Sequence, residues 1–452
     1  MLRHFCTTTR TSLRPATAWA LGCALLLAPP CDVVVAQDSL YAAIRYGQLE
    51  VVQDYLENRA DPNGTASDDD GNPLRLLQVA LYGRQEDIAL ALLEAGADFS
   101  ASGVSLNLVV AEGMPRVLDF LLSDAPERFR EATPAEQREL LTPAVTRGYF
   151  QVLETLLSHS RRVGLTWDGS VLSSAVVTAT TFRQYDLARR LLTFGALPSD
   201  TAMVAATQNG SPGLVRRLLL LGGNPTATRP ENRAKPRPGA GTPIDYAWQR
   251  YNDNTGDERQ TARFILFELS RAGAVLQERD LPAGVPRNGI AELAAIPAPS
   301  TRIVEAARFG FYEVVEQLIR DREELDEDAL IEAISIALTA RHNDVAFLLI
   351  SSGIELNEAA LQTASKGNSP GIVRHLLSLG LDPNLRVDGK TAIEAWWERT
   401  ADRQSYRLGA DYILHELIRG GGDACWLVEH ERQFNNAQAI LLRTSAPRCW
   451  PE

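Results

Sequence analysis

The chain has 452 residues, of which 45% are hydrophobic and 23% are charged, a composition that fits a folded protein and excludes a disordered one. This length allows two or three ordinary domains or one elongated array. The formal net charge is −12. A chain this acidic repels nucleic acid and anionic lipid, so we expect neither as a partner.

The first 36 residues have the pattern of a cleaved export signal. Three arginines precede an apolar segment at 18–28, and Val34 and Ala36 then occupy the small-residue positions of a cleavage site. A signal anchor is the alternative, but the apolar segment is short for a membrane span, which needs about 20 residues. We expect cleavage after Ala36, no stable membrane insertion afterwards, and delivery to a bacterial periplasm or, alternatively, to the extracellular medium.

From residue 38 onward the sequence repeats one plan of two short helices. Small residues such as Ala42 and Ala43 mark the first helix, and apolar residues four positions apart, such as Val52 and Leu56, mark the second. We expect a left-handed glycine to end the first helix at Gly47, Gly83, Gly113, Gly148 and Gly310. Helix pairs that cannot bury an apolar face alone stack on one another, so the plan predicts an all-α solenoid.

These units resemble the ankyrin repeat. The similarity lies in the A-A-x-x-G, [IV]-V-x-x-L-L and G-A-D-x-N elements, seen in "LYAAIRYGQLEVVQDYLENRADPN" at 40–63 and "LQTASKGNSPGIVRHLLSLGLDPN" at 361–384. The resemblance implies an ankyrin-like helical solenoid of about eleven helix-pair repeats between residues 38 and 422. It also implies a non-catalytic scaffold that binds a protein partner through its concave face and hairpin loops, without identifying that partner.

A longer block of the sequence recurs as well. "GSPGLVRRLLLLGGNP" at 210–225 returns as "NSPGIVRHLLSLGLDP" at 368–383. Gly148 aligns with Gly310, Gly195 with Gly353, Pro212 with Pro370, and Glu268 with Glu416. We therefore expect two duplicated halves, at about 138–274 and 301–422. The expected organisation is a signal at 1–36, an N-terminal array at 37–275, a Pro/Gly-rich linker at 276–300, a C-terminal array at 301–422 and a C-terminal cap at 423–452.

Only two of the five cysteines follow the signal segment. Cys425 and Cys449 lie near the C-terminus, and in an oxidising compartment such a pair favours a disulfide. This bond would close a loop of about 25 residues and contribute roughly 3 kcal/mol in the chain-entropy treatment. Two unrelated buried thiols are the alternative. We expect a disulfide-closed cap over the last repeat.

The sequence contains none of the common catalytic or cofactor motifs. Its histidines have no H-E-x-x-H or H-x-x-x-H spacing, and neither a G-x-S-x-G elbow nor a phosphate-binding loop is present. "SDDDGN" at 67–72 resembles a calcium loop but lacks the bidentate Glu at loop position twelve. We expect no catalytic, cofactor or metal site and no enzyme activity. A cryptic enzyme site in the cap and a self-assembling structural protein are the two alternatives.

Two groups of residues are candidates for partner contacts. A basic, Pro-rich insertion at 229–241 suits an acidic partner, and a disordered insertion is the alternative. Its bases are Arg229, Arg233, Lys235 and Arg237. Tryptophans at equivalent places in the two halves are the second group, because Trp is common at binding hot spots, although it also fills space between repeats. They are Trp248, Trp396 and Trp397.

Overall fold

In the computed structural model, helices follow one another in pairs along the chain. This arrangement confirms the predicted all-α solenoid. The structure describes residues 40–45, 47–58, 61–67, 72–228, 241–274, 302–321, 327–354, 356–366, 370–400 and 410–428. The signal segment, the bases of the insertion, the linker and Cys449 lie outside these residues.

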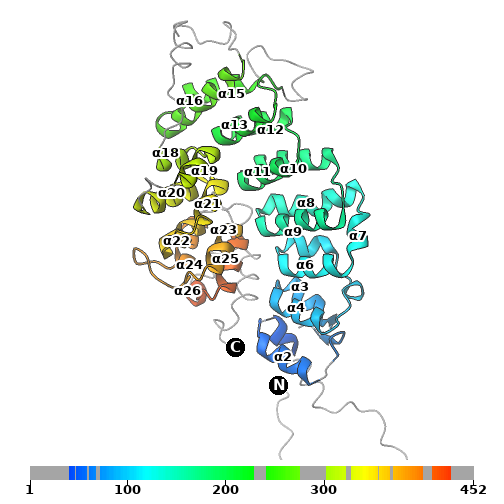
Figure 1. The fold of residues 1–452 in the computed structure, drawn as a ribbon. Helices are drawn as coiled ribbons and strands as arrows, with labels where there is room; N and C mark the ends of the chain where they lie inside the picture. The colour runs from blue at the N-terminus through cyan, green and yellow to red at the C-terminus, as the bar shows by residue number, and fades with distance from the viewer. Residues whose placement is uncertain are drawn as a thin grey trace, which may run out of the picture.

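Residues 40–274 form a first arm, which climbs from the N-terminus on the blue-to-green side of Figure 1. The first helices of its pairs are residues 40–45, α3 (Leu76–Tyr82), α5 (Leu106–Ala111), α8 (Pro134–Arg147), α10 (Gly169–Thr181), α12 (Asp200–Gln208) and α15 (Pro243–Asp253). The second helices are α2 (Leu49–Glu57), α4 (Glu86–Glu94), α6 (Pro115–Asp124), α9 (Phe150–Val163), α11 (Tyr185–Phe194), α13 (Pro212–Leu220) and α16 (Gly256–Arg271). The connections include the antiparallel strands β1 (Thr65–Ser67) and β2 (Pro73–Arg75), the short helix η1 (Ser100–Ser102), and α7 (Pro126–Arg130).

Residues 302–428 form a second arm, which descends beside the first and brings its end near the N-terminus (Figure 1). Its first helices are α18 (Ile303–Arg308), α20 (Glu327–Ala340), α22 (Glu358–Lys366) and α24 (Ala392–Thr400). Its second helices are α19 (Tyr312–Arg320), α21 (Asn343–Ile350), α23 (Pro370–Ser378) and α25 (Ala410–Arg419), and α26 (Cys425–Val428) follows them. Contacts of Phe264 with Phe309 and Phe311 join the two arms at α16 and α18.

A residue with a left-handed backbone separates the two helices of a pair. At Gly148 φ is +77°, and the bend places Tyr149 at the start of α9, as the sequence predicts. Gly83 ends α3 as predicted, but its φ is −78°, and the following residue, Arg84, takes the left-handed position at +58°. Arg183 and Arg341 adopt the same backbone in later pairs. The turn therefore requires the conformation and not always glycine.

At one place in each arm, an asparagine side chain links one helix pair to the next. Asn63 donates to the carbonyl of Gly96 at 3.2 Å and accepts from the amide of Asp98 at 2.8 Å. Asn384 in the second arm makes the same two bonds with Gly421 and Asp423, at 2.9 and 2.7 Å. These bonds satisfy backbone groups at the turns and set the register between neighbouring units.

Candidate functional site

A cavity of about 620 Å³ opens in the first arm, where α4, η1 and α5 meet α6, α7 and α8. The chain departs from the repeat plan here, because α7 is inserted between the second helix of one pair and the first helix of the next. Pro126 begins α7 immediately after α6 ends, and α7 packs against α9. The extra helix leaves the apolar edges of α5 and α6 partly uncovered.

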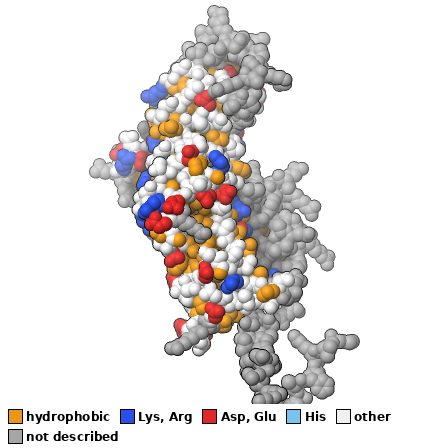
Figure 2. All heavy atoms as spheres, turned by 90° about the vertical axis from the view of Figure 1, so that its right-hand side faces the viewer, with side chains coloured by type: hydrophobic (Ala, Val, Ile, Leu, Met, Phe, Trp, Pro, Cys, Tyr) orange, Lys and Arg blue, Asp and Glu red, His pale blue; other side chains and the backbone are white. Residues whose placement is uncertain are grey.

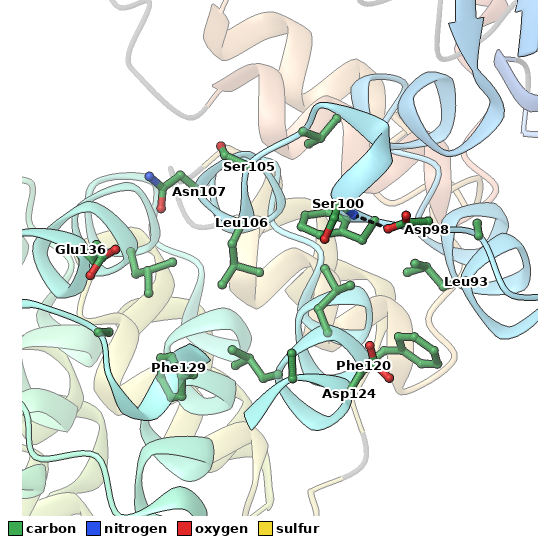
Figure 3. A pocket seen from close by; sticks show the side chains of 18 of the residues that line it. Leu93, Asp98, Ser100, Ser105, Leu106, Asn107, Phe120, Asp124, Phe129 and Glu136 are labelled. Atoms are coloured by element: carbon green, nitrogen blue, oxygen red, sulfur yellow. Dashed lines mark hydrogen bonds between the residues drawn. The ribbon is translucent and has the colours of Figure 1, made fainter. Parts of the chain in front are cut away.

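The wall of this cavity is largely apolar. Leu106 of α5, Phe120 and Leu121 of α6 are half-buried, whereas Phe129 of α7 is buried against Trp167. In Figure 3, Leu106 lies near the middle of the view, with Asn107 and Glu136 toward one end and Asp98 and Asp124 toward the other. A hydrophobic side chain that enters this space would remove more apolar surface from water.

Every charged residue lining the cavity is acidic: Asp98, Asp124, Glu136 and Glu139. Asp98 accepts from the backbone of Ser100 at 2.8 Å, and Glu139 accepts from Asn107 at 2.9 Å. Asp124 is exposed and has no hydrogen bond or ion pair within the part of the chain that the structure describes. The rim can therefore attract a cationic group, with Asp124 free to bind it.

Glu136, at this rim, also caps the first turn of α8. Its carboxylate accepts from the backbone amide of Thr133 at 2.8 Å, and the Thr133 hydroxyl accepts from the Glu136 amide, which forms a capping box at the start of α8. The backbone hydrogen bond from Thr133, followed by the hydroxyl bond, lowers the pKa of Glu136. Glu136 is therefore ionised at neutral pH and adds to the negative charge of the rim.

The second helices of the two arms face one another, and α11 packs directly against α21 (Figure 1). A Cβ added to Gly213 of α13 would lie only 1.6 Å from the carbonyl oxygen of Gly310. On the other side of α11 and α21, a Cβ on Gly371 of α23 would lie 2.8 Å from the carbonyl oxygen of Gly148. The concave face that we expected to bind a partner is thus occupied by the other arm, which corrects that expectation.

Arg189 of α11 crosses between the arms in a buried position. Its Nε donates to Asp344 at 2.9 Å, its Nη1 donates to Glu313, and its guanidinium lies 4.4 Å from the centre of the Tyr312 ring. Two carboxylates therefore neutralise this buried cation. Asp186, one turn earlier on α11, is 3% exposed, and neither of its oxygens has a hydrogen-bond partner among the described residues.

A second group of charges joins the end of the second arm to the start of the first. Glu86 of α4 is 2% exposed and forms an ion pair with Arg419 of α25 at 3.0 Å. Arg374 of α23 forms two hydrogen bonds with Glu416, at 2.9 and 2.6 Å. The guanidinium of Arg84 lies 4.4 Å from the centre of the Tyr412 ring. These contacts hold the two ends of the solenoid together.

The structure corrects the predicted role of the tryptophans. Trp396 is fully buried, and Trp248 and Trp397 are 6% and 7% exposed, so all three fill the core between helices and cannot present a contact surface. The cavity was not predicted from the sequence, although the Pro-containing segment before α8 broke the repeat plan at this place. Cys425 is disulfide-bonded, and its pairing with Cys449 stays a prediction because Cys449 is not described.

The outer side of the first arm is the face left open by this arrangement. Viewed from the side of α7, α8 and α10, it carries acidic and basic side chains interspersed with hydrophobic ones (Figure 2). Within the described ranges, no helix combines the length and the apolar character of a membrane span. The same ranges hold no cluster of three or more His, Cys, Asp or Glu residues able to bind a metal ion.

Comparisons with solved structures include matches to a helical-repeat protein. No protein-family profile and no curated protein matches the sequence. Solved structures that match include the pentatricopeptide repeat protein PPR10 in complex with an 18-nt psaJ RNA element, at 16% identity and a TM-score of 0.23. A cysteine-to-serine variant of that protein with the same RNA matches equally. Each match covers 93% of this chain and only 58% of the other.

These comparisons correct one expectation from the sequence. Net charge led us to exclude a nucleic-acid partner, but the matching structures are of a helical-repeat protein bound to RNA. The exclusion is therefore withdrawn, because a whole-chain charge of −12 does not describe every surface of a solenoid. A TM-score of 0.23 assigns no partner to this chain.

Proposed function

We propose that this protein is a non-catalytic binding scaffold whose outer cavity receives a basic segment of a protein partner. The observation that carries the proposal is the cavity between α5, α6 and α7, which has an apolar wall and a rim whose charged residues are all acidic. A peptide with an aromatic or aliphatic side chain flanked by Lys or Arg has the matching chemistry. Its apolar side chain would contact Leu106 and Phe120, and its bases would face Asp124 and Glu139.

The closed arrangement of the arms supports an outer site. In the contact between the arms, Gly213 and Gly310 leave no room for even one added carbon atom. A partner that used the inner face would have to separate buried charges such as Arg189 and Asp344, whereas the cavity is open without any rearrangement. Buried charges left unpaired carry a high free-energy cost, so the outer route is favoured.

The finer features of the fold belong to the same proposal. The bonds of Asn63 and Asn384 to the turns of following units support an ankyrin-like solenoid of about eleven repeats in duplicated halves. The disulfide-bonded state of Cys425 supports a cap closed through Cys449 and an oxidising compartment. We therefore place the mature protein in the periplasm, with secretion as the alternative, after removal of residues 1–36.

Fluorescence titration of the full mature chain with designed peptides tests the binding site. A peptide with one Phe between paired lysines should bind, and Phe120→Ala or the Asp124→Asn/Glu139→Gln pair should weaken binding by about tenfold. The affinity should fall as salt rises, because exposed charges contribute. A peptide with glutamates in place of the lysines should not bind.

Two matched variants control for general effects on the surface. Phe182→Ala removes a Phe that is 46% exposed on the first arm outside the cavity, and Glu332→Gln removes an exposed carboxylate of α20. Both should leave the affinity unchanged. Equal affinity of wild-type protein for the lysine and glutamate peptides, or equal losses in cavity and control variants, would refute the proposed site. Photo-crosslinking from residue 120 in the native compartment would then identify the partner.

A further inference from the structure

We propose that the two halves of the chain recognise each other as two copies of one subunit would, and that the buried carboxylate of Asp186, which has no ion pair among the described residues, makes this closure weaken as pH rises. The inner face is then a self-interaction surface with a built-in pH response. The inference does not depend on the outer cavity or on its ligand.

The contacts between the arms come in corresponding pairs. Gly213 and Gly371 align in the two halves, as do Gly310 and Gly148, and the structure places Gly213 on Gly310 and Gly371 on Gly148. A contact in which residue i of one copy meets j of the other, and j meets i, is the mark of two-fold symmetry. The axis passes between α11 and α21, which are themselves corresponding helices in contact.

Aromatic contacts beside this axis follow the same rule. Phe150 stacks on Phe347 with ring centres 4.8 Å apart, and Tyr312, the counterpart of Phe150, lies under Arg189 at 4.4 Å. Phe347 is the counterpart of Arg189. The two contact sites therefore have the same arrangement, but Arg189 occupies in one site the position that Phe347 occupies in the other.

The difference between Arg189 and Phe347 explains why Asp186 has no ion pair. Asp186 and Asp344 occupy corresponding positions, and Arg189 reaches across the axis to Asp344. The residue placed to reach Asp186 in the same way is Phe347, which cannot donate a hydrogen bond. Asp186 is thus 3% exposed without an ion pair or a side-chain hydrogen bond among the described residues, and only the amides of Asp186 and Leu187 at the start of α11 act on its carboxylate. Burial first, and then the Asp344 carboxylate, raises the pKa of Asp186 to about 8, although backbone amides of α11 act in the opposite direction.

Among the residues that the structure describes, no cation pairs with Asp186. The ionisable groups around this part of α11 include Asp344 and His342 from α21, Glu313 and Tyr312 from α19, Glu154 from α9 and Arg217 from α13, together with Arg183, Tyr185, Arg189 and Arg190. Arg189 and Arg217 are directed to Glu313, and Arg190 pairs with Glu154. Burial lowers the pKa of His342, which keeps its ring neutral. α10 carries no ionisable side chain.

The direction of the pH response follows from proton linkage. The closed state holds a proton on Asp186 that the open, hydrated carboxyl releases near its ordinary pKa of 3.8. Raising the pH from that value to about 8 therefore favours the open state, by about tenfold per pH unit. Above this window the carboxylate is charged in both states and the dependence ends.

Amide hydrogen exchange of α11 and α21 in the full chain tests this closure. After correction for the intrinsic pH dependence of exchange, wild-type protection of α11 and α21 should fall about a hundredfold from pH 6 to pH 8. Asp186→Asn, which cannot ionise, should abolish this fall. Phe347→Arg, which supplies the counterpart of Arg189, should also abolish it even if the asparagine variant folds poorly.

Asp87→Asn is the matched control, because Asp87 occupies the same place in an earlier unit but its side chain is 46% exposed. This variant should show the wild-type pH response. A wild-type protein whose protection does not change between pH 6 and pH 8 would overturn the proposal. A hundredfold fall that persists in both Asp186→Asn and Phe347→Arg would overturn it as well.

Discussion

Glu268 in the first arm and Glu416 in the second occupy corresponding positions on α16 and α25, yet their pKa values shift in opposite directions. Burial raises the pKa of Glu268, because Arg216 approaches it only to 3.8 Å. Burial acts in the same direction on Glu416, but the charge of Arg374 and its two hydrogen bonds outweigh burial and lower the pKa. One sequence position therefore has two electrostatic environments.

The difference arises from what lies across from each helix. Near Glu416, Glu86 of the first arm forms an ion pair with Arg419 at 3.0 Å and lies 4.0 Å from Arg374. Acidic and basic side chains therefore alternate in one network around Glu416. Near Glu268 one carboxylate oxygen has no hydrogen-bond partner among the described residues. Contact with the first arm thus accompanies a closer, doubly hydrogen-bonded ion pair at Glu416, whereas the ion pair at Glu268 is longer.

The largest effect is expected from Glu416→Gln. It leaves the largely buried Arg374 without its countercharge and should lower the free energy of unfolding by about 4 kcal/mol. Glu268→Gln, the corresponding change in the first arm, should cost less than about 1 kcal/mol. Urea denaturation of the two variants measures this ratio. Equal losses would show that the two pairs have the same strength.

Gly213→Ala should lower the free energy of unfolding by about 3 kcal/mol, because the added methyl group collides with backbone that a rotamer change cannot move. Gly371→Ala, whose Cβ would lie 2.8 Å from Gly148, should cost about 1 kcal/mol. Thermal unfolding compares them with Gly169→Ala, where a Cβ meets nothing within 4 Å. If Gly213→Ala is as stable as Gly169→Ala, the arms are not in close contact.

Only the second arm ends in a disulfide-bonded cysteine. The Cys425→Ala/Cys449→Ala pair should cost about 3 kcal/mol, because the unfolded chain regains the entropy of a loop of about 25 residues. Intact mass after non-reducing alkylation should show no free thiol in the wild-type mature protein. Two alkylated cysteines would contradict the predicted bond and remove this difference between the arms.

The smallest effect concerns acid titration of the two glutamates. The lowered pKa of Glu416 means that its contribution is present above the ordinary pKa of 4.5 and is lost as pH falls below it, by about 1 kcal/mol per unit. The raised pKa of Glu268 means that stability falls as pH increases through 4.5. Urea midpoints from pH 3 to pH 6 should therefore diverge in opposite directions for Glu416→Gln and Glu268→Gln, each relative to wild type. Parallel curves would contradict the comparison.

Local rules in the sequence predicted much of the fold. Apolar spacing and turn residues predicted the helix pairs, and the alignment of Gly213 with Gly371 predicted two similar halves. The tryptophans were misjudged because composition does not show whether a large side chain faces a neighbour or water. The cavity at Leu106 and Phe120 was missed because it lies where the extra helix α7 interrupts the repeat plan, and no motif marks that place.

The sequence by itself determined the helices, their pairing and their order, because helix periodicity, capping and tight turns act over a few residues. Only the tertiary structure decided that the arms close on each other, that Asp344 has an arginine and Asp186 has none, and that the free face lies outside. Small per-unit rotations accumulate along a solenoid and set its curvature. Contacts between residues more than a hundred positions apart depend on the accumulated rotation, which local sequence patterns do not predict.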